Sequence, residues 1–151
     1  MKKDDEGYQL VEVGLLAIGT PTAATGRVYL DSSTLADEVQ RFNETPRGVE
    51  LGTPERHGQM TDDEWYRRVM QVDESNVCGR IAGVRRVEKD GVVMLVGDFK
   101  TDGPHAKRAQ ELLESEKAHF GLRSMCSVNT LTDPPSHDIK NIVTWDLVPK
   151  E

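Results

Sequence analysis

The strongest constraint on the fold is a pair of β-prone runs around a tight turn at residues 77–101. The sequence there reads VCGRIAGVRRVEKDGVVMLVGDFKT, so Lys89, Asp90 and Gly91 join two valine-rich runs. Asp-Gly between two such runs is a strong hairpin signal, because glycine accepts the positive φ that the turn requires. The segment therefore predicts a β-hairpin.

Helical and extended patterns surround the hairpin. Leu35, Val39 and Phe42 recur at helical spacing after Ser32 or Ser33, either of which can cap a helix. The segment IVTWDLV alternates, and Trp145 lies on its expected core face with Val143 and Leu147. Strands are expected at 8–19, 27–31, 119–131 and 139–149, helices at 32–44 and 103–118, a long loop at 45–63, and one helical turn leading into a strand at 62–72.

The order of these elements indicates the fold class. Two strands, a helix, a long loop, a hairpin, a helix and two strands favour an α+β fold with a mostly antiparallel, barrel-like sheet and two or three helices. The chain has 151 residues, no repeat and no linker-like segment, which predicts a single domain over residues 1–151.

Composition excludes several classes of function. The formal net charge of −7 repels nucleic-acid phosphates, so we expect no nucleic-acid partner. No apolar run approaches the roughly 20 residues of a membrane span, and the charged N-terminus lacks a signal-peptide core, so we expect a soluble intracellular protein without membrane contact. Cys78 and Cys126 stand singly, which predicts buried thiols, no metal and no cofactor.

Five short motifs, in this order, resemble those of the tailed-phage prohead (capsid maturation) proteases. They are TGRVYL, VELGTPERH, KTDGPHAKRAQELL, FGLRSM and IVTWDLV, and together they span about residues 10–148. Members of that family are serine proteases whose fold is similar to herpesvirus assemblin. The resemblance implies cleavage of phage scaffold and major capsid proteins, inside the prohead or virion in the host cytoplasm.

The resemblance also assigns positions to the catalytic centre. Thr53 stands where the family has its histidine. When Arg123 is aligned with the family arginine, Gly121 and Leu122 stand at the serine positions. In the family this arginine is thought to help build the oxyanion site, so the resemblance implies that role for Arg123. The other interpretation of Arg123 is an ion pair with an acidic residue, or a solvated side chain.

Two residues close to these positions could replace the missing catalytic groups. His57 lies four residues after Thr53 and is a candidate general base, and Ser124 follows Arg123 and is a candidate nucleophile. Ser124 reaches the face of Arg123 only if a bulge or register change re-aims it, because successive strand residues point to opposite faces. His119 is a second candidate base, and His137, Asp138 and Asp146 are candidates for orienting the imidazole.

The sequence leaves three functions open. The first is a serine endopeptidase that uses His57, Ser124 and Arg123. The second is a catalytically inactive homologue that serves as a virion structural or interaction protein, and it is favoured by the residues at Thr53, Gly121 and Leu122. The third is an α+β binding module whose motif matches are coincidental. Assembly into a homo-oligomer is possible in each case.

Overall fold

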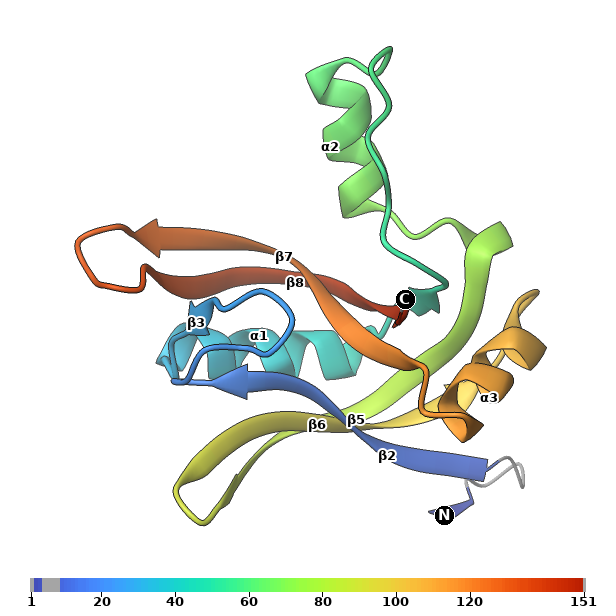
Figure 1. The fold of residues 1–151 in the computed structure, drawn as a ribbon, viewed down its shortest axis with the longest axis horizontal. Helices are drawn as coiled ribbons and strands as arrows, with labels where there is room; N and C mark the ends of the chain where they lie inside the picture. The colour runs from blue at the N-terminus through green and yellow to red at the C-terminus, as the bar shows by residue number, and fades with distance from the viewer. Residues whose placement is uncertain (1, 4–8, 151) are drawn as a thin grey trace.

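The computed structural model describes residues 2–3 and 9–150 and confirms the expected α+β class (Figure 1). Three α-helices and a short 3-10 turn accompany two sheets that are antiparallel apart from one short parallel pair. The elements are β1 (Lys2–Lys3), β2 (Gln9–Ile18), β3 (Val28–Tyr29), α1 (Ser33–Glu44), β4 (Gly48–Glu50), α2 (Asp62–Met70), η1 (Glu74–Asn76), β5 (Val77–Lys89), β6 (Val92–Thr101), α3 (Ala106–Glu114), β7 (Ala118–Asn129) and β8 (Ser136–Pro149).

The two sheets curl into a half-barrel. One has the strand order β1-β2-β6-β5-β4 and the other the order β3-β8-β7. They join on one side where Leu51, directly after β4, bridges Leu147 of β8, and the Gly52 N–H donates to the Leu147 carbonyl at 2.7 Å. On the other side β2 passes close to β7, and the described strands form no ladder between them. The half-barrel therefore has one joined side and one open seam.

The hairpin that the sequence predicts is formed by β5 and β6. Asp90 and Gly91 have φ values of 54° and 78°. Positive φ at both central residues is the signature of the type I′ turn, whose twist suits antiparallel strands. Glycine at the second position takes this conformation without steric cost.

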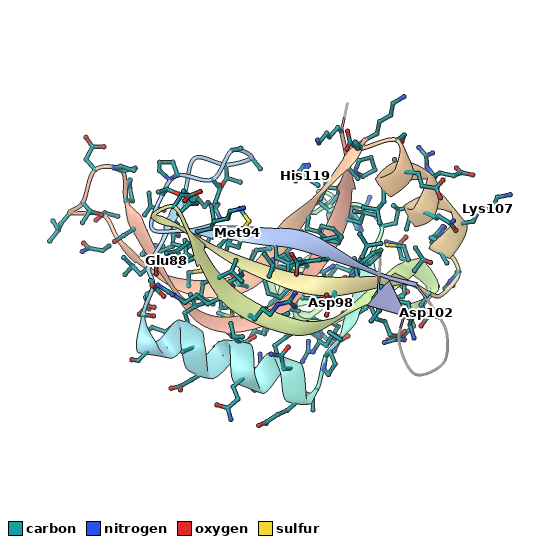
Figure 2. The ribbon with its side chains drawn as sticks, turned by 90° about the horizontal axis from the view of Figure 1, so that it is seen from below. Glu88, Met94, Asp98, Asp102, Lys107 and His119 are labelled. Atoms are coloured by element: carbon teal, nitrogen blue, oxygen red, sulfur yellow. The ribbon has the colours of Figure 1, made fainter. Side chains whose placement is uncertain are left out.

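Helix α1 supplies one wall of the core. Ser32 is its N-cap, and its hydroxyl accepts from the Leu35 N–H at 3.2 Å. Leu35 and Phe42 are buried, and the Phe42 ring meets Trp145 edge-on with centroids 5.4 Å apart. Figure 2 shows α1 on the opposite side of the curled sheets from His119.

Two expectations about residues 45–72 need correction. The segment 45–63 is not all loop, because Gly48, Val49 and Glu50 form β4, which pairs with β5. The segment 62–72 holds a nine-residue helix rather than one helical turn leading into a strand, and a 3-10 turn follows at Glu74–Asn76. A capping box, in which Thr61 and Glu64 bond each other's backbone N–H, explains why this helix forms.

The alternation along β8 does not separate a core face from an exposed face. Trp145 is buried as expected, and so are Val143 and Leu147. The opposite set of Ile142, Thr144 and Asp146 is buried too. This strand lies inside the half-barrel, with α1 against it and β7 and the β4 end beside it, so both of its faces are covered. Of the two cysteines, Cys78 is buried and Cys126 is half-buried.

Candidate functional site

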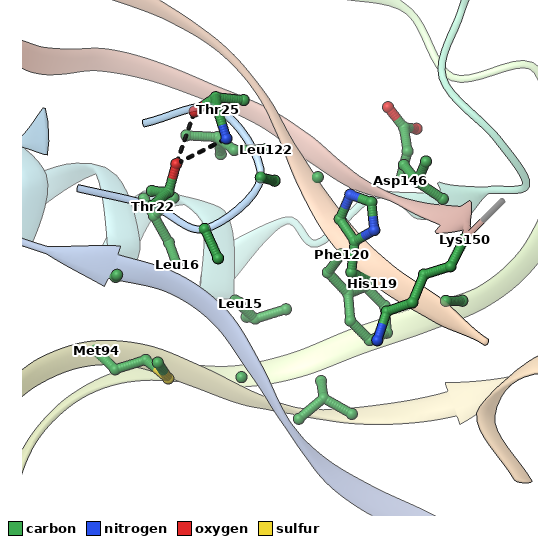
Figure 3. Close-up of a pocket in the computed structure, with 18 of the residues that line it drawn as sticks. Leu15, Leu16, Thr22, Thr25, Met94, His119, Phe120, Leu122, Asp146 and Lys150 are labelled. Atoms are coloured by element: carbon green, nitrogen blue, oxygen red, sulfur yellow. Dashed lines mark hydrogen bonds between the residues drawn. The ribbon is translucent and has the colours of Figure 1, made fainter. Parts of the chain in front are cut away.

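A pocket of about 1050 Å³ lies at the open seam of the half-barrel. Residues 13–17 of β2 and 118–122 of β7 form two of its sides. The loop after β2, with Thr22 and Thr25, forms a third, and the ends of β8 and of the chain contribute Asp146 and Lys150. Figure 3 shows Thr22 and Thr25 on one side of the pocket and His119, Asp146 and Lys150 on the other.

Both strands that border the pocket have free edges. In the described part of the chain, β7 pairs only with β8. Strand β2 pairs with β6 on one edge, while on the other edge β1 covers only Gln9 and Leu10. From Val11 to Ile18 the second edge of β2 therefore has no strand partner among the described residues. Unpaired backbone N–H and C=O groups at such edges can accept an additional strand.

Arg123 of β7 lies beside the pocket in a buried cluster of charges. It is 6% exposed. Its Nε and Nη2 donate to the two Asp146 oxygens at 3.1 and 2.5 Å, and Nη2 also donates to Glu50 at 2.9 Å. Its Nη1 donates to the carbonyls of Val69 and Gln71 at 3.2 and 2.9 Å. A guanidinium has five N–H donors, and in this structure there are five bonds, so each donor is used inside the protein.

Glu50 is the second centre of this cluster. Its side chain is fully buried and accepts from Arg68 at 2.6 and 2.9 Å, from Arg123, from Asn76 at 3.1 Å and from the Asp73 N–H at 3.1 Å. Burial opposes ionisation, but the hydrogen bonds from the arginines and Asn76 outweigh it and lower the pKa of Glu50 to about 2. Glu50 is therefore a fixed negative charge at neutral pH.

Asp146 responds to burial in the opposite direction. Desolvation raises its pKa above the ordinary aspartate value, and the hydrogen bonds from Arg123 only partly offset that effect. The difference arises because Glu50 has two arginines and two further donors, whereas Asp146 has hydrogen bonds from Arg123 alone within the described part of the chain. Asp146 is thus the less firmly ionised carboxylate, and it is the one that lines the pocket.

Ser124 has a different environment from Arg123. Its half-buried hydroxyl lies 3.3 Å from the Cys126 sulfur, which is its hydrogen-bond partner among the described residues. The β7–β8 ladder shifts register between Arg123 and Ser124, because Arg123 pairs with Thr144 while Ser124 pairs with Ile142. The extra residue of this bulge, Val143, lies on β8, so the bulge does not interrupt the alternation of side chains along β7, the strand that carries Ser124.

His57 lies on a projecting segment that we call the arm, residues 51–72. The arm runs outward after β4 and returns through α2 (Figure 1). His57 is exposed, and its carbonyl accepts from the Met60 N–H at 3.1 Å. In the part of the chain that the structure describes, no hydrogen bond joins His57 to Ser124. Arg123 and Ser124 are thus neighbours on β7, while His57 comes from the arm.

The described residues contain neither a cluster of metal-ligand side chains nor a membrane-spanning helix. None of their His, Cys, Asp and Glu side chains gather in threes at a distance suitable for an ion. Within residues 2–3 and 9–150, each helix is too short or too polar to cross a bilayer.

Comparison with known proteins identifies the family. The profile of the Peptidase S80 family matches residues 1–151. The chain belongs to this family. A curated relative, the capsid maturation protease of Pseudomonas phage phiKZ, is 29% identical over 168 aligned positions that cover 96% of this chain. The chain spans about 58% of the length of that relative. No solved structure matches the chain.

The family match confirms the resemblance to phage prohead proteases. Several residues that this resemblance assigns to the catalytic centre lie at the pocket. Thr53, Gly121 and Leu122, which the sequence resemblance assigns to the family's histidine and serine positions, all line it. Asp146, one candidate for orienting the imidazole, and His119, the second candidate base, line it as well. The other two candidates, His137 and Asp138, lie near the start of β8, beside β3.

The sequence alone does not reveal the buried charge cluster of Arg123 and Glu50. Its pattern places Glu50 in a loop and indicates no role for Arg68 and Asn76, which bind Glu50. The local signal was weak, because a lone glutamate between Val49 and Leu51 indicates a buried charge only when its partners are known. Those partners lie 18 to 73 residues further along the chain.

Proposed function

We propose that this chain is a catalytically inactive homologue of the prohead proteases, which acts as a virion structural or interaction protein in the phage head. The observation that carries this proposal is the buried state of Arg123, whose five N–H donors all have partners inside the protein. An oxyanion needs donors that are free to point at it. Arg123 could supply one only by giving up a partner in the buried cluster.

The other parts of a serine peptidase support the same proposal. A nucleophilic serine needs a base within hydrogen-bond reach, about 2.6–3.2 Å. Ser124 instead has Cys126 beside its hydroxyl, and His57 lies on the arm. At the pocket itself, threonine, glycine and leucine stand at the positions that the family resemblance assigns to the catalytic groups.

The pocket and its free strand edges fit a partner in extended conformation. A peptide that enters the seam can hydrogen-bond to the edge of β7 or of β2, as in other cases of β-strand addition. The half-buried side chains of Val13, Phe120 and Leu122 offer apolar surface to its side chains. We propose that segments of the phage scaffold and major capsid proteins are these partners, and that binding occurs inside the assembling prohead in the host cytoplasm.

The test is to incubate the purified chain with the scaffold and major capsid proteins of its own phage. We expect a complex by size-exclusion chromatography, no cleavage products, and no labelling by a fluorophosphonate probe. Thr53→Trp places a large side chain at the pocket and should weaken binding at least tenfold. Thr130→Trp, at an exposed position outside the pocket, is the matched control. Cleavage that is lost in Ser124→Ala would refute the proposal.

The second candidate is an active serine endopeptidase with Ser124 as nucleophile, His57 as base and Arg123 at the oxyanion. The position of Ser124 directly after Arg123 on β7 favours it. This function requires the arm to bring His57 against β7. It predicts that His57→Ala and Ser124→Ala abolish cleavage equally, whereas Ser127→Ala, two strand residues beyond the motif, has no effect.

A further inference from the structure

The arm has little packing of its own to fix its direction. None of the nine residues of α2 is buried, although the helix carries Trp65, Tyr66 and Val69. Its first turn is closed by the capping box of Thr61 and Glu64. The arm is therefore well formed locally, but the contacts that hold it against the half-barrel are concentrated at its base.

Arg123 binds both ends of that base. Its Nη2 donates to Glu50, the residue directly before the arm, at 2.9 Å. Its Nη1 donates to the carbonyls of Val69 and Gln71, at the other end, at 3.2 and 2.9 Å. These carbonyls belong to the end of α2, where backbone acceptors lack intrahelical partners and a positive charge is favourable. One guanidinium thus connects the residue before the arm with the last residues of the arm.

Two further arginines reinforce the same end. Arg68 of α2 reaches back to Glu50 with two bonds at 2.6 and 2.9 Å. Arg47, before β4, donates to the Met70 carbonyl at 2.7 Å. The α2 end of the arm is therefore held by hydrogen bonds from charged groups, which depend strongly on geometry. At the other end, Leu51 packs against the hydrophobic core.

The remaining bonds of Arg123 connect the arm to the pocket. Nε and Nη2 donate to Asp146, which lines the pocket from β8. Thr53, at the start of the arm, lines the same pocket. Any change that draws Asp146 away from Arg123 must leave a buried guanidinium with too few acceptors, which is costly in a low-dielectric interior.

We infer that Arg123 is a positioning residue that latches the arm to the pocket, so that the orientation of α2 depends on the carboxylate of Asp146. The guanidinium makes planar, two-pronged contacts that a lysine ammonium cannot reproduce. The latch would operate in a binding domain and in a cleaving domain alike. Its consequence is that occupancy of the pocket near Asp146 changes how α2 is presented to a partner.

Hydrogen exchange of the intact chain, followed by mass spectrometry, tests the latch. In Arg123→Lys we expect the amides of α2 to exchange at least tenfold faster, while those of β6 stay within twofold of the wild type. In Asp146→Asn, whose change lies on β8 and not on the arm, we expect at least a threefold increase in α2. Arg86→Lys is the matched control, because Arg86 forms a two-pronged pair with Asp31 on the surface, away from the arm.

Two outcomes would overturn the latch. The first is exchange in α2 that stays at the wild-type rate in a folded Arg123→Lys. The second is an increase that spreads equally over α2 and β6, because this reports general destabilisation. Should Arg123→Lys fail to fold, Arg68→Gln decides. The Arg68 side chain is 28% exposed, and this substitution removes its bonds to Glu50 and to the Gln71 carbonyl while Arg123 stays in place. Unchanged α2 exchange in both Arg68→Gln and Asp146→Asn also overturns the latch.

Discussion

Replacing Glu50 by glutamine tests the electrostatic account of the buried cluster most directly. The carboxylate of Glu50 is fully buried and binds Arg68 and Arg123, so the variant leaves two arginines facing a neutral amide. Breaking a buried ion pair by removing one partner costs about 3–5 kcal/mol. We expect the free energy of unfolding of Glu50→Gln to fall by about 3 kcal/mol at pH 7.

The pH dependence gives an independent magnitude. The pKa of Glu50 falls from an ordinary value of 4.5 to about 2 on folding. A tenfold change in proton affinity is worth about 1.4 kcal/mol, so the full linkage is about 3 kcal/mol. Because the folded pKa is depressed, this stability is present above pH 4.5 and is lost as the pH falls toward 2. About 2 kcal/mol of it should be gone by pH 3.

Asp146 opposes this trend, since burial raises its pKa and its protonation in acid removes an unfavourable buried charge. The measurement is therefore the difference in unfolding free energy between wild type and Glu50→Gln, by urea denaturation from pH 7 to pH 3. The two chains share Asp146, so its own contribution largely cancels. We expect the difference to be level above pH 5 and to shrink by about 2 kcal/mol at pH 3.

Glu111→Gln is the control for losing a surface pair, because Glu111 lies 3.5 Å from Arg108 with both side chains more than half exposed. It should change the unfolding free energy by no more than about 0.5 kcal/mol. A Glu50→Gln variant as stable as the wild type at pH 7, with a difference that is independent of pH, would contradict the account of the cluster.

Two further predictions concern packing and thiol chemistry. A Cβ added at Gly79 would lie 2.2 Å from the Phe99 ring, so Gly79→Ala should lower the unfolding free energy by at least about 2 kcal/mol. The control is Gly58→Ala, where the Cβ meets nothing within 4 Å and the unfolding free energy should change by less than about 1 kcal/mol. Equal shifts of the melting temperature in the two variants would contradict this prediction. Burial raises the pKa of the Cys78 thiol to about 12, whereas Cys126 is half-buried. A disulfide reagent at pH 8 should therefore modify one thiol of the native chain, and Cys126→Ser should remove that reaction; rapid modification of both thiols would show that Cys78 is accessible.

The success of the sequence in locating the hairpin has a local cause. The turn at Asp90 and Gly91 depends on backbone conformations that these two residue types adopt readily, and the strands beside it carry their own β preference. The cap of α1 at Ser32 and its buried Leu35 and Phe42 are equally local. The order of these elements was then enough to predict the α+β class and a barrel-like sheet.

The sequence was less successful where burial comes from several elements at once. On β8 it assigned Thr144 and Asp146 to the face away from the core, yet both are buried. Period-2 alternation identifies a core face only when the other face meets water, and here β8 is covered on both faces. Strand β4 was missed for a related reason, because three residues carry too little pattern to identify a strand.

The sequence by itself determined the family and the class of fold, because short motifs and local backbone preferences carry that information along the chain. It also placed Arg123 beside Ser124. Only the tertiary structure decided what surrounds them, since Glu50, Gln71 and Asp146 reach Arg123 across separations of 23 to 73 residues. Electrostatic partners depend on distance in space, and that distance is set by the curl of the sheets and the return of the arm, which local patterns do not encode.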